Sequence, residues 1–552
     1  MPTVNLDKKT VLRYIGKNLT DKVLLEKIPM LGTDLEQITD DEIVVEIFPN
    51  RPDMLSEEGF SRAFSAFMGI KPGFRHYDTK KEGSTVAVKD LPKEWPYAVC
   101  AIVRGLKLDD DKLKSIIQLQ EKLGVTLLRR RKKGGLGLYP LDKIKLPVTF
   151  TSYKKEDIRF RPLEGSAVFK ADDILIKHPK GKEYGHIIEG WSRYPVFVDA
   201  EGTIMSMPPI INSHDVGKVT DATKNVFVEC TGTDLNTLKA AMNIMLLTLA
   251  DMGGKIYSLE MDYGKDKFSC PDFTPRKIKI DKAYAERLLG LKFTDSEVKD
   301  LLSRMGLGFE NGCALVPSYR TDILHPIDLV EEIAIAYGYD NFESEISDAA
   351  TVGSESSKTI FLRKVSDLFV GLGYLECKSF HMSNARTLFD KMNRKVSVDL
   401  VRTANAVNIE YDAMRNKILP GLMKILSENT HNEYPQNLFE AGTVFLKDKS
   451  LETNVSETVS LAFASAGLVS DFSQMKAAVE SFALNLDIDI KFEEHDDSSF
   501  ISGRCARLVL GGKIVGVVGE IHPSVLVNFG LDVPVSACEI ELSKVMDAVQ
   551  KH

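Results

Sequence analysis

The sequence predicts a multidomain protein of the α+β class. Its length of 552 residues suggests three or four domains if each has about 150 residues. Stretches with helical periodicity and stretches with strand periodicity follow one another in separate blocks, and there is no internal repeat. Hydrophobic residues at 43% and charged residues at 27% are typical of an ordinary globular protein.

Charge and cysteine usage exclude several classes of protein. The net charge of −8 gives the chain no global basic field for nucleic acid, so any RNA contact has to be local or assisted by a partner. The seven cysteines form no CxxC pair, which argues against a zinc knuckle and fits reduced thiols in a cytoplasm. The first residues lack the apolar stretch of a signal peptide, and the most apolar helix, residues 238–252, is too short for a bilayer. We therefore expect a cytoplasmic protein without membrane contact.

Residues 1–80 are expected to form an N-terminal α+β domain. Residues 43–48 alternate like a β-strand, and residues 49–53 (PNRPD) predict a rigid turn. Ser56 suits the N-cap of a helix, and the two glutamates after it lie in the first turn, where the helix dipole favours them. Taken alone, these residues predict a strand, a turn and a helix, and no chemistry.

Residues 86–265 are expected to form a mixed α/β domain. Residues 194–207 (YPVFVDAEGTIMSM) predict a hairpin with Glu201-Gly202 as its turn. Earlier in this block lie five successive cations that can bind phosphates: Arg129, Arg130, Arg131, Lys132 and Lys133. The charge pattern is equally compatible with an exposed flexible loop that binds nothing.

Residues 272–346 are expected to form a compact domain of the winged-helix-like or helix-turn-helix kind. The expected elements are two amphipathic helices, a short strand and a third helix: Lys282–Leu289, residues 296–305, Cys313–Val316 and residues 328–337. Pro326 suits the first turn of the third helix, and Gly338 stands where a helix commonly ends.

The third helix of this domain carries a cluster of carboxylates. Asp328, Glu331 and Glu332 stand at i, i+3 and i+4, so they share one helix face, and Asp322 can turn a fourth carboxylate toward the same point. Two such charges about 5 Å apart repel by roughly 1 kcal/mol in water and by more when partly buried. A hard dication bound by oxygen ligands removes that repulsion, which makes Mg²⁺ the expected ion. The alternative is an ordinary solvated helix face.

Residues 347–357 are small and polar and are expected to link the third domain to a last one, residues 358–552. The last domain is expected to begin with an amphipathic helix, residues 360–369. It is then expected to contain an apolar strand at residues 459–463 and a hairpin around Gly511-Gly512. This order predicts an antiparallel sheet core.

Two stretches of the chain resemble one protein family. Residues 317–342 read PSYRTDILHPIDLVEEIAIAYGYDNF, and residues 50–64 read NRPDMLSEEGFSRAF. Both are similar to signatures of the β subunit of phenylalanyl-tRNA synthetase, in its archaeal and eukaryotic cytosolic form. The resemblance covers nearly the whole chain in the family's order. It implies that residues 86–265 are an editing domain and that residues 358–552 are a catalytically inactive class II synthetase-like core.

The resemblance also implies roles for individual residues. In the family, the positions that match Asp322, Asp328, Glu331 and Glu332 bind Mg²⁺ near the contact with the α subunit. The editing site would use Glu229 as the acceptor for a phenol hydroxyl, and its other expected residues are Ser206, Asn212, Ser213 and Thr231. Apart from the family, Glu229 could instead be an exposed strand residue. The spacing of His186 and His214 does not support a general base.

The last domain is not expected to activate an amino acid. A class II active site needs arginines that neutralise the phosphates of ATP, and the corresponding stretch, residues 437–442, contains none. The candidate for the third motif, residues 511–520, carries only Lys513, and a Walker-type GxxxxGK[ST] is absent. We therefore expect no synthetic catalytic site in this chain.

The function that the resemblance implies is that of a phenylalanine–tRNA ligase β subunit. In an expected (αβ)₂ heterotetramer, the α subunit would bind ATP and phenylalanine and charge tRNA(Phe). This chain would hold Mg²⁺, contact tRNA(Phe) and hydrolyse Tyr-tRNA(Phe). The alternatives are a free-standing aminoacyl-tRNA deacylase and a non-catalytic, nucleic-acid-binding assembly protein; the net charge of −8 counts against the second.

Overall fold

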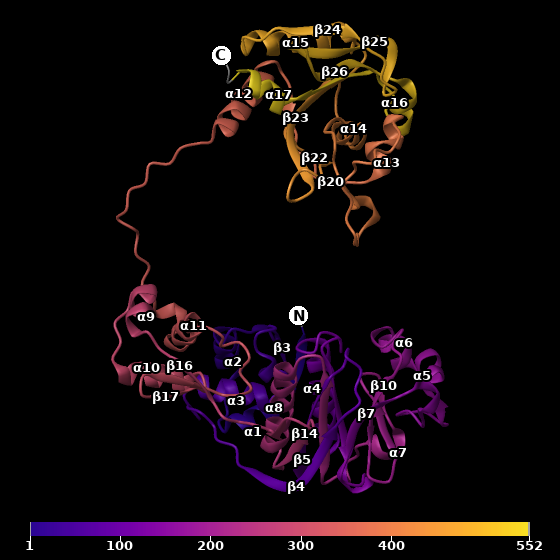
Figure 1. The fold of residues 1–552 in the computed structure, drawn as a ribbon. Helices are drawn as coiled ribbons and strands as arrows, with labels where there is room; N and C mark the ends of the chain where they lie inside the picture. Colours follow the sequence, from indigo (N-terminus) through magenta and orange to yellow (C-terminus); the bar gives the residue numbers. More distant parts are fainter. Residues whose placement is uncertain (1, 550–552) are drawn as a thin grey trace. The chain divides into compact units, whose positions relative to one another are not determined.

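A computed structural model describes residues 2–549 of the chain, which divide into two compact units, residues 1–346 and 347–552 (Figure 1). Each unit has its own sheets and core, which agrees with a multidomain protein that mixes helices and sheets. Residues 343–356 contain no helix or strand and include most of the predicted linker.

The N-terminal part of the first unit contains a small antiparallel sheet of order β1-β3-β2. Its strands and helices are β1 (Thr3–Asp7), α1 (Lys8–Ile15), α2 (Asp21–Met30), β2 (Asp34–Ile38), β3 (Glu42–Glu46) and α3 (Glu57–Phe67). The predicted cap of α3 is confirmed, because the Gly59 N–H donates to Ser56 Oγ at 3.1 Å. Gly59 has to be a glycine, since a Cβ there would lie 1.9 Å from the Asp53 carbonyl oxygen.

A ten-stranded mixed sheet forms the centre of the first unit, with strand order β12-β11-β10-β7-β4-β14-β5-β13-β6 and β15 paired to β14. The two pairings of β4, with β14 and β7, are parallel and the others are antiparallel. The predicted hairpin around Glu201-Gly202 is confirmed as β10 and β11. The strands are β4 (Thr79–Val88), β5 (Tyr97–Arg104), β6 (Gly134–Pro140), β7 (Thr149–Tyr153), β10 (Tyr194–Val198), β11 (Ile204–Met207), β12 (Ile211–Asn212), β13 (Val226–Gly232), β14 (Lys255–Asp262) and β15 (Lys267–Cys270).

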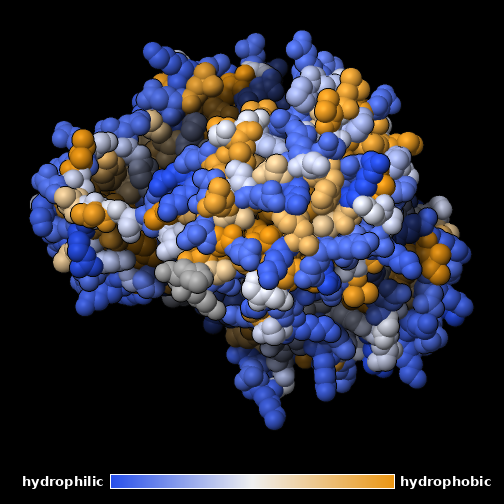
Figure 2. All heavy atoms as spheres, turned by 90° about the horizontal axis from the view of Figure 1, so that it is seen from above, coloured by the Kyte–Doolittle hydropathy of each residue, from blue (hydrophilic) through white to orange (hydrophobic). Residues whose placement is uncertain are grey.

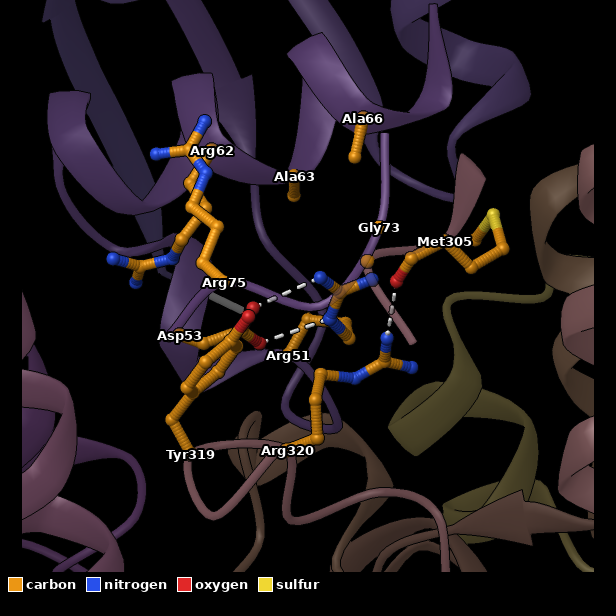
Figure 3. A pocket seen from close by; sticks show the side chains of 11 residues that line it. Arg51, Asp53, Arg62, Ala63, Ala66, Gly73, Arg75, Met305, Tyr319 and Arg320 are labelled. Carbon is orange, nitrogen blue, oxygen red and sulfur yellow. Dashed lines mark hydrogen bonds and ion pairs between the residues drawn. The ribbon is translucent and has the colours of Figure 1, made fainter. Parts of the chain in front are cut away.

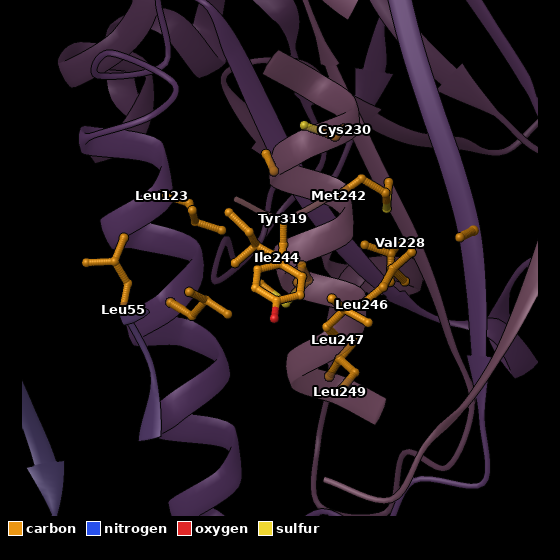
Figure 4. Close-up of a cluster of buried hydrophobic side chains, with 14 of the residues drawn as sticks. Leu55, Leu123, Val228, Cys230, Met242, Ile244, Leu246, Leu247, Leu249 and Tyr319 are labelled. Carbon is orange, nitrogen blue, oxygen red and sulfur yellow. The ribbon is translucent and has the colours of Figure 1, made fainter. Parts of the chain in front are cut away.

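Helix α8 (Leu235–Asp251) is the predicted apolar helix, and it packs on β5 and β13. Figure 4 shows its side chains meeting those of neighbouring elements; the labelled residues include Leu123, Val228, Met242, Ile244 and Leu249. Across residues 2–549, no helix is both long and apolar enough to cross a membrane. The face drawn in Figure 2 is mostly hydrophilic, with hydrophobic residues in several separate patches.

Four more helices belong to the central domain, together with a small two-stranded sheet. The helices are α4 (Asp110–Val125), α5 (Ala171–Lys177), α6 (Pro179–Tyr184) and α7 (His214–Gly217). The strands of the small sheet are β8 (Arg159–Phe160) and β9 (Phe169–Lys170). Helices α4 and α6 contribute residues to the wall of the cavity described below.

The last part of the first unit has two helices, a three-stranded sheet of order β16-β18-β17 and a third helix. These elements are β16 (Arg276–Lys279), α9 (Lys282–Leu289), α10 (Asp295–Arg304), β17 (Gly308–Glu310), β18 (Cys313–Val316) and α11 (Pro326–Tyr337). The predicted helices and strand are all present, with Pro326 at the start of α11 and Gly338 directly after it. Their apolar side chains belong to the same core as the central sheet.

The second unit is built on a seven-stranded sheet of order β19-β22-β23-β27-β26-β25-β24, antiparallel except between β19 and β22. The predicted helix, apolar strand and hairpin are present as α12, β23 and β25–β26. Alternate residues of β22 and β23 enter two separate hydrophobic clusters, so the sheet is packed on both faces. The main elements are α12 (Ser357–Gly371), β19 (Leu375–Glu376), α14 (Leu419–Glu428), β22 (Gln436–Lys447), β23 (Val455–Ala466), α15 (Phe472–Asn485), β24 (Ile490–Glu494), β25 (Phe500–Leu510), β26 (Lys513–Ile521), α16 (Pro523–Phe529), β27 (Val535–Glu541) and α17 (Leu542–Val549).

Candidate functional site

A cavity of about 320 Å³ opens beside strands β6, β12 and β13 of the ten-stranded sheet. Helix α4 and the α5–α6 region border its other sides. Its polar lining includes Gln120, Glu121, Arg131, Glu164, His178, Lys180, Asn212 and Glu229. The mixture of apolar walls with a few converging polar groups is typical of a small-molecule site.

Glu229 is placed in this cavity by the central strand β13, where it is only 3% exposed. Its neighbours in register are Cys100 on β5 and Gly137 on β6. Gly137 makes room for the carboxyl group, because a Cβ at that position would lie 2.5 Å from Glu229 Oε1. The alternative of an exposed strand residue is therefore wrong.

The Glu229 carboxyl group is held by one phenol and has no cation bonded to it. Tyr139 Oη lies 3.2 Å from Glu229 Oε1, and Oε2 has no hydrogen-bond partner. Burial raises the pKa of Glu229 to about 8, against smaller opposing effects of Tyr139 and Arg131. The group therefore carries a proton at neutral pH.

The other predicted editing residues surround this pair unequally. Asn212 lines the cavity, and its Oδ1 lies 3.1 Å from Tyr139 Oη. Ser206 and Thr231 are buried, and neither hydroxyl has a hydrogen-bond partner. Thr231 is two residues from Glu229 on β13 and so points to the same face of the sheet. Ser213 is buried next to Asn212 but is not part of the cavity wall.

The five cations of residues 129–133, here called the basic turn, differ in what they contact. Arg129, Arg130 and Arg131 all have left-handed backbones, with φ of 50°, 50° and 61°. Arg131 turns back into the cavity wall, where its Nη1 donates to the carbonyls of Pro209 at 2.9 Å and Ile210 at 3.0 Å. Arg129, Arg130 and Lys132 are exposed, and Lys133 is half-buried. The expectation of a free phosphate-binding loop thus fits Arg129, Arg130 and Lys132 and does not fit Arg131.

The four carboxylates near α11 do not converge. Asp322 and Glu332 both pair with Arg320, at 2.7 and 2.8 Å. Asp328 instead accepts the N–H groups of Leu324 and His325, both at 2.7 Å, and so caps the helix. Glu331 is exposed and accepts the hydroxyl of Tyr339 at 3.0 Å.

These contacts do not fit a metal site formed by this chain alone. The Arg320 guanidinium already pairs with both Asp322 and Glu332, and residues 2–549 contain no group of three or more acidic, histidine or cysteine side chains placed to hold a metal ion. In the isolated chain the four carboxylates do not meet at one point. Mg²⁺ binding with additional ligands from a partner stays a prediction.

Arg320 belongs to a buried network that joins the two stretches of family-like sequence (Figure 3). Arg51 binds Asp53 through two hydrogen bonds of 2.9 and 2.8 Å, and Arg320 binds Asp322 in the same way at 2.8 and 2.7 Å. Both arginines line one small cavity of about 10 Å³. Each ion pair lies within one stretch, and the two stretches meet where Arg62 lies over the ring of Tyr319, 4.8 Å from its centre.

A second cavity, of about 250 Å³, lies in the second unit beside α14. Its buried guanidinium, Arg415, is 3% exposed and lies 2.5 Å from Glu440 of β22. The other cations of its wall are Lys378, Lys417 and Lys424. Because Arg415 is committed to Glu440, it is not free to bind the phosphates of ATP.

The sequence interpretation did not include Tyr139 or the structural role of Arg131. Tyr139 is separated from Glu229 by 90 positions in the sequence, so only strand pairing brings the two together. The sequence of residues 134–139 (GGLGLY) does contain a signal for Tyr139. Its alternation places Gly135, Gly137 and Tyr139 on one face of a strand.

Comparisons with known proteins agree with this architecture. Residues 278–339 match the tRNA synthetase B5 domain, and residues 343–542 match the phenylalanyl tRNA synthetase beta chain CLM domain. The phenylalanine–tRNA ligase beta subunits of Thermococcus sibiricus and Pyrococcus horikoshii are each 38% identical over 98% of this chain and 98% or 99% of their own. A crystal structure of an N-terminal fragment of the Pyrococcus horikoshii phenylalanyl-tRNA synthetase beta subunit has a TM-score of 0.59 and 37% identity, over 61% of this chain and 99% of the fragment. The chain belongs to the family of phenylalanine–tRNA ligase β subunits.

Proposed function

We propose that this chain acts in the cytoplasm with an α subunit, in an (αβ)₂ heterotetramer that attaches phenylalanine to tRNA(Phe). The α subunit would bind ATP and phenylalanine and perform the synthesis. The second unit supports this division, because Arg415 is committed to Glu440 and residues 437–442 contain no arginine. The mostly antiparallel seven-stranded sheet is consistent with an inactive class II-like core over residues 358–552, and the helices and sheet of residues 272–346 with a winged-helix-like domain.

The cavity at Glu229 is proposed to hydrolyse Tyr-tRNA(Phe). A synthetic pocket shaped for phenylalanine rejects tyrosine only weakly, because an added hydroxyl gives only about a hundred-fold discrimination. A second site that recognises the hydroxyl solves this problem. The observation that carries the proposal is a buried glutamate with an unpartnered oxygen at the wall of a 320 Å³ cavity.

The side chains around this cavity favour attack by a bound water over attack by a protein nucleophile. Burial raises the pKa of Cys100, the register partner of Glu229 on β5, well above its usual range, so its thiol is not ionised. Both nitrogens of His178 are used, Nε2 with the Leu163 carbonyl at 3.1 Å and Nδ1 with the Lys180 N–H at 3.2 Å. The hydroxyls of Ser206 and Thr231 have no neighbouring base bonded to them. In the proposed reaction these hydroxyls and Asn212 orient the ester and the water.

Deacylation of preformed Tyr-tRNA(Phe) by the αβ complex tests the proposal. Removal of Glu229 leaves the tyrosine hydroxyl buried without a partner, which costs about 1–3 kcal/mol, so Glu229→Ala should slow deacylation by roughly five- to 150-fold. Phenylalanine charging should stay nearly unchanged, because synthesis is assigned to the α subunit. Glu201→Ala, in the exposed hairpin turn, is the control. Equal deacylation by wild type and Glu229→Ala would contradict the assignment of Glu229.

A further inference from the structure

Tyr139 stands between two groups that ordinarily only accept hydrogen bonds. Its Oη lies 3.2 Å from Glu229 Oε1 and 3.1 Å from Asn212 Oδ1. A tyrosine has one proton to donate, whereas an ionised carboxylate and an amide oxygen have none on the atoms concerned. With the amide oxygen of Asn212 turned toward Tyr139, both short contacts can be hydrogen bonds only if a second proton is present. A protonated Glu229 supplies it: Glu229 then donates to Tyr139, and Tyr139 donates to Asn212.

The surroundings of Glu229 contain no free cation that would favour its ionised form. The ionisable groups that interact electrostatically with Glu229 are Tyr139 from β6, Cys100 from β5, Cys230 from its own strand and Arg131 from the turn after α4. The other charged or titratable side chains of the cavity wall are Glu121, Glu164, His178 and Lys180. Arg131 is already bonded to two carbonyls and lies over the ring of Tyr184, 4.2 Å from its centre. Burial accordingly raises the pKa of Glu229 to about 8.

The backbone of β6 is arranged to hold this pair in place. Gly137 is the register partner of Glu229, and Tyr139 is two residues further along the same strand, so its side chain points to the same face. A Cβ at Gly137 would lie 2.5 Å from Glu229 Oε1 and 3.0 Å from Tyr139 Oη. The contact between phenol and carboxyl group therefore depends on a glycine at this position.

We propose that Tyr139 is a positioning residue that holds the protonated Glu229 in place and leaves its Oε2 free to accept the hydroxyl of a tyrosyl ester. This role rests on the hydrolytic function proposed above. An uncharged carboxyl group costs less to keep in a dry cavity than an ion. Its unpartnered oxygen can accept a hydrogen bond from a tyrosine side chain and can form none with a phenylalanine ring.

When Glu229 ionises at high pH, Tyr139 turns its proton from Asn212 to the carboxylate. Hydrogen bonds to charged groups are stronger than those between neutral groups. The Tyr139 hydroxyl therefore lowers the pKa of Glu229, whereas Asn212 competes for the same proton and so raises that pKa. Removal of the two side chains should move the titration in opposite directions.

Infrared difference spectroscopy of the αβ complex, at pH values below and above the Glu229 pKa of about 8, measures this titration without substrate. The band of a protonated carboxyl group that is absent in Glu229→Gln identifies Glu229. Tyr139→Phe should move the midpoint to higher pH, by about one unit. Asn212→Ala should move it to lower pH. Tyr263→Phe is the matched control, since its hydroxyl bonds the Ala98 backbone and lies outside the cavity wall.

Deacylation assays with the same variants connect the titration to substrate choice. Tyr139→Phe should reduce the preference for Tyr-tRNA(Phe) over Phe-tRNA(Phe) by about ten-fold, because the carboxyl group loses its partner. A midpoint that is unmoved in Tyr139→Phe, or that moves in the same direction in both variants, overturns the proposal for Tyr139. A wild-type complex that leaves Tyr-tRNA(Phe) intact contradicts the hydrolytic function, and with it the substrate role of this pair. In that case the infrared midpoints still show separately whether the pairing of Tyr139 with Glu229 is correct.

Discussion

Glu229 in the first unit and Glu440 in the second are buried to nearly the same extent and have opposite surroundings. Each lies on an inner strand of a large sheet, and they are 3% and 1% exposed. Glu440 has Arg415 at 2.5 Å on Oε1, while Oε2 accepts the Ser379 N–H at 3.0 Å and hydroxyl at 2.6 Å. Glu229 has one phenol contact and an unused oxygen.

This difference separates a structural carboxylate from one that is available to a ligand. A buried ion is tolerated when a partner of opposite charge and further hydrogen bonds replace the water that it loses. Glu440 meets that condition within the chain, with a donor on each oxygen. Glu229 lacks it, so it binds a proton and keeps an acceptor free. The unpartnered oxygen of Glu229 belongs to a side chain of the cavity wall, and this combination is what indicates a binding site.

The largest effect is expected from breaking the complete pair. Glu440→Gln leaves Arg415 buried with an uncompensated charge, which should lower the free energy of unfolding of the second unit by about 3–5 kcal/mol. Urea unfolding of the complex, followed with a probe in the second unit, measures the change. Glu480→Gln removes an exposed i,i+4 pair with Lys476 at 3.6 Å and should change stability by about 0.5 kcal/mol or less. Equal effects of the two substitutions would show that burial does not decide the cost.

Glu229→Gln should give an effect whose size, unlike that of Glu440→Gln, depends on pH. The pKa of Glu229 is about 8 in the folded protein and about 4.5 when unfolded, so between these values the unfolded state gains stability by releasing the proton. Wild type should therefore lose about 1.4 kcal/mol of stability per pH unit from this group as pH rises from 4.5 to 8. The glutamine variant lacks that loss. Its stability relative to wild type should rise as pH increases through this window. It should level off above the folded-state pKa of Glu229, about 8.

Urea unfolding at several pH values tests this sign directly. Glu58, whose pKa burial raises to about 7, contributes in the same direction in both proteins and cancels in the difference. A difference between variant and wild type that is constant with pH would mean that Glu229 is ionised in the folded state. In that case Glu229 would resemble Glu440 more closely than the structure indicates.

The sequence predicted local structure well because local rules determine it. The Ser56 cap, the start of α11 at Pro326 and the hairpin at Glu201-Gly202 each depend on a few neighbouring residues, and all three are confirmed. Glu229 was identified only through the family resemblance, since nothing in residues 226–232 states how deeply β13 is buried. Tyr139 joins it from another strand, and the alternation of residues 135–139 places Tyr139 on one face of that strand without showing which strand pairs with it.

For the carboxylates of α11, the sequence predicted where the side chains lie and not which partners they meet. The i, i+3, i+4 spacing placed three carboxylates on one helix face, yet it could not show which of them was already neutralised. Arg320 lies only two residues before Asp322, but its pairing with Glu332 depends on how the loop folds onto α11. Helical spacing predicts where side chains point, and the partners that meet them come from tertiary structure.

Arg131 and Arg130 differ in the same way as Glu440 and Glu229, because one is bonded within the chain and the other is not. A substitution of Arg130 is expected to have the smallest effect. Arg131 is committed to two carbonyl groups, whereas Arg130 is exposed and free to meet a phosphate. Arg130→Ala should weaken tRNA(Phe) binding a few-fold at low salt and reduce the slope of log affinity against log salt by about one, as expected for one lost phosphate contact. Lys22→Ala, an exposed cation on α2, is the control and should change neither value. An unchanged salt slope in Arg130→Ala would show that the exposed side of this turn does not contact RNA and that its left-handed backbone serves only to carry Arg131 into the cavity wall.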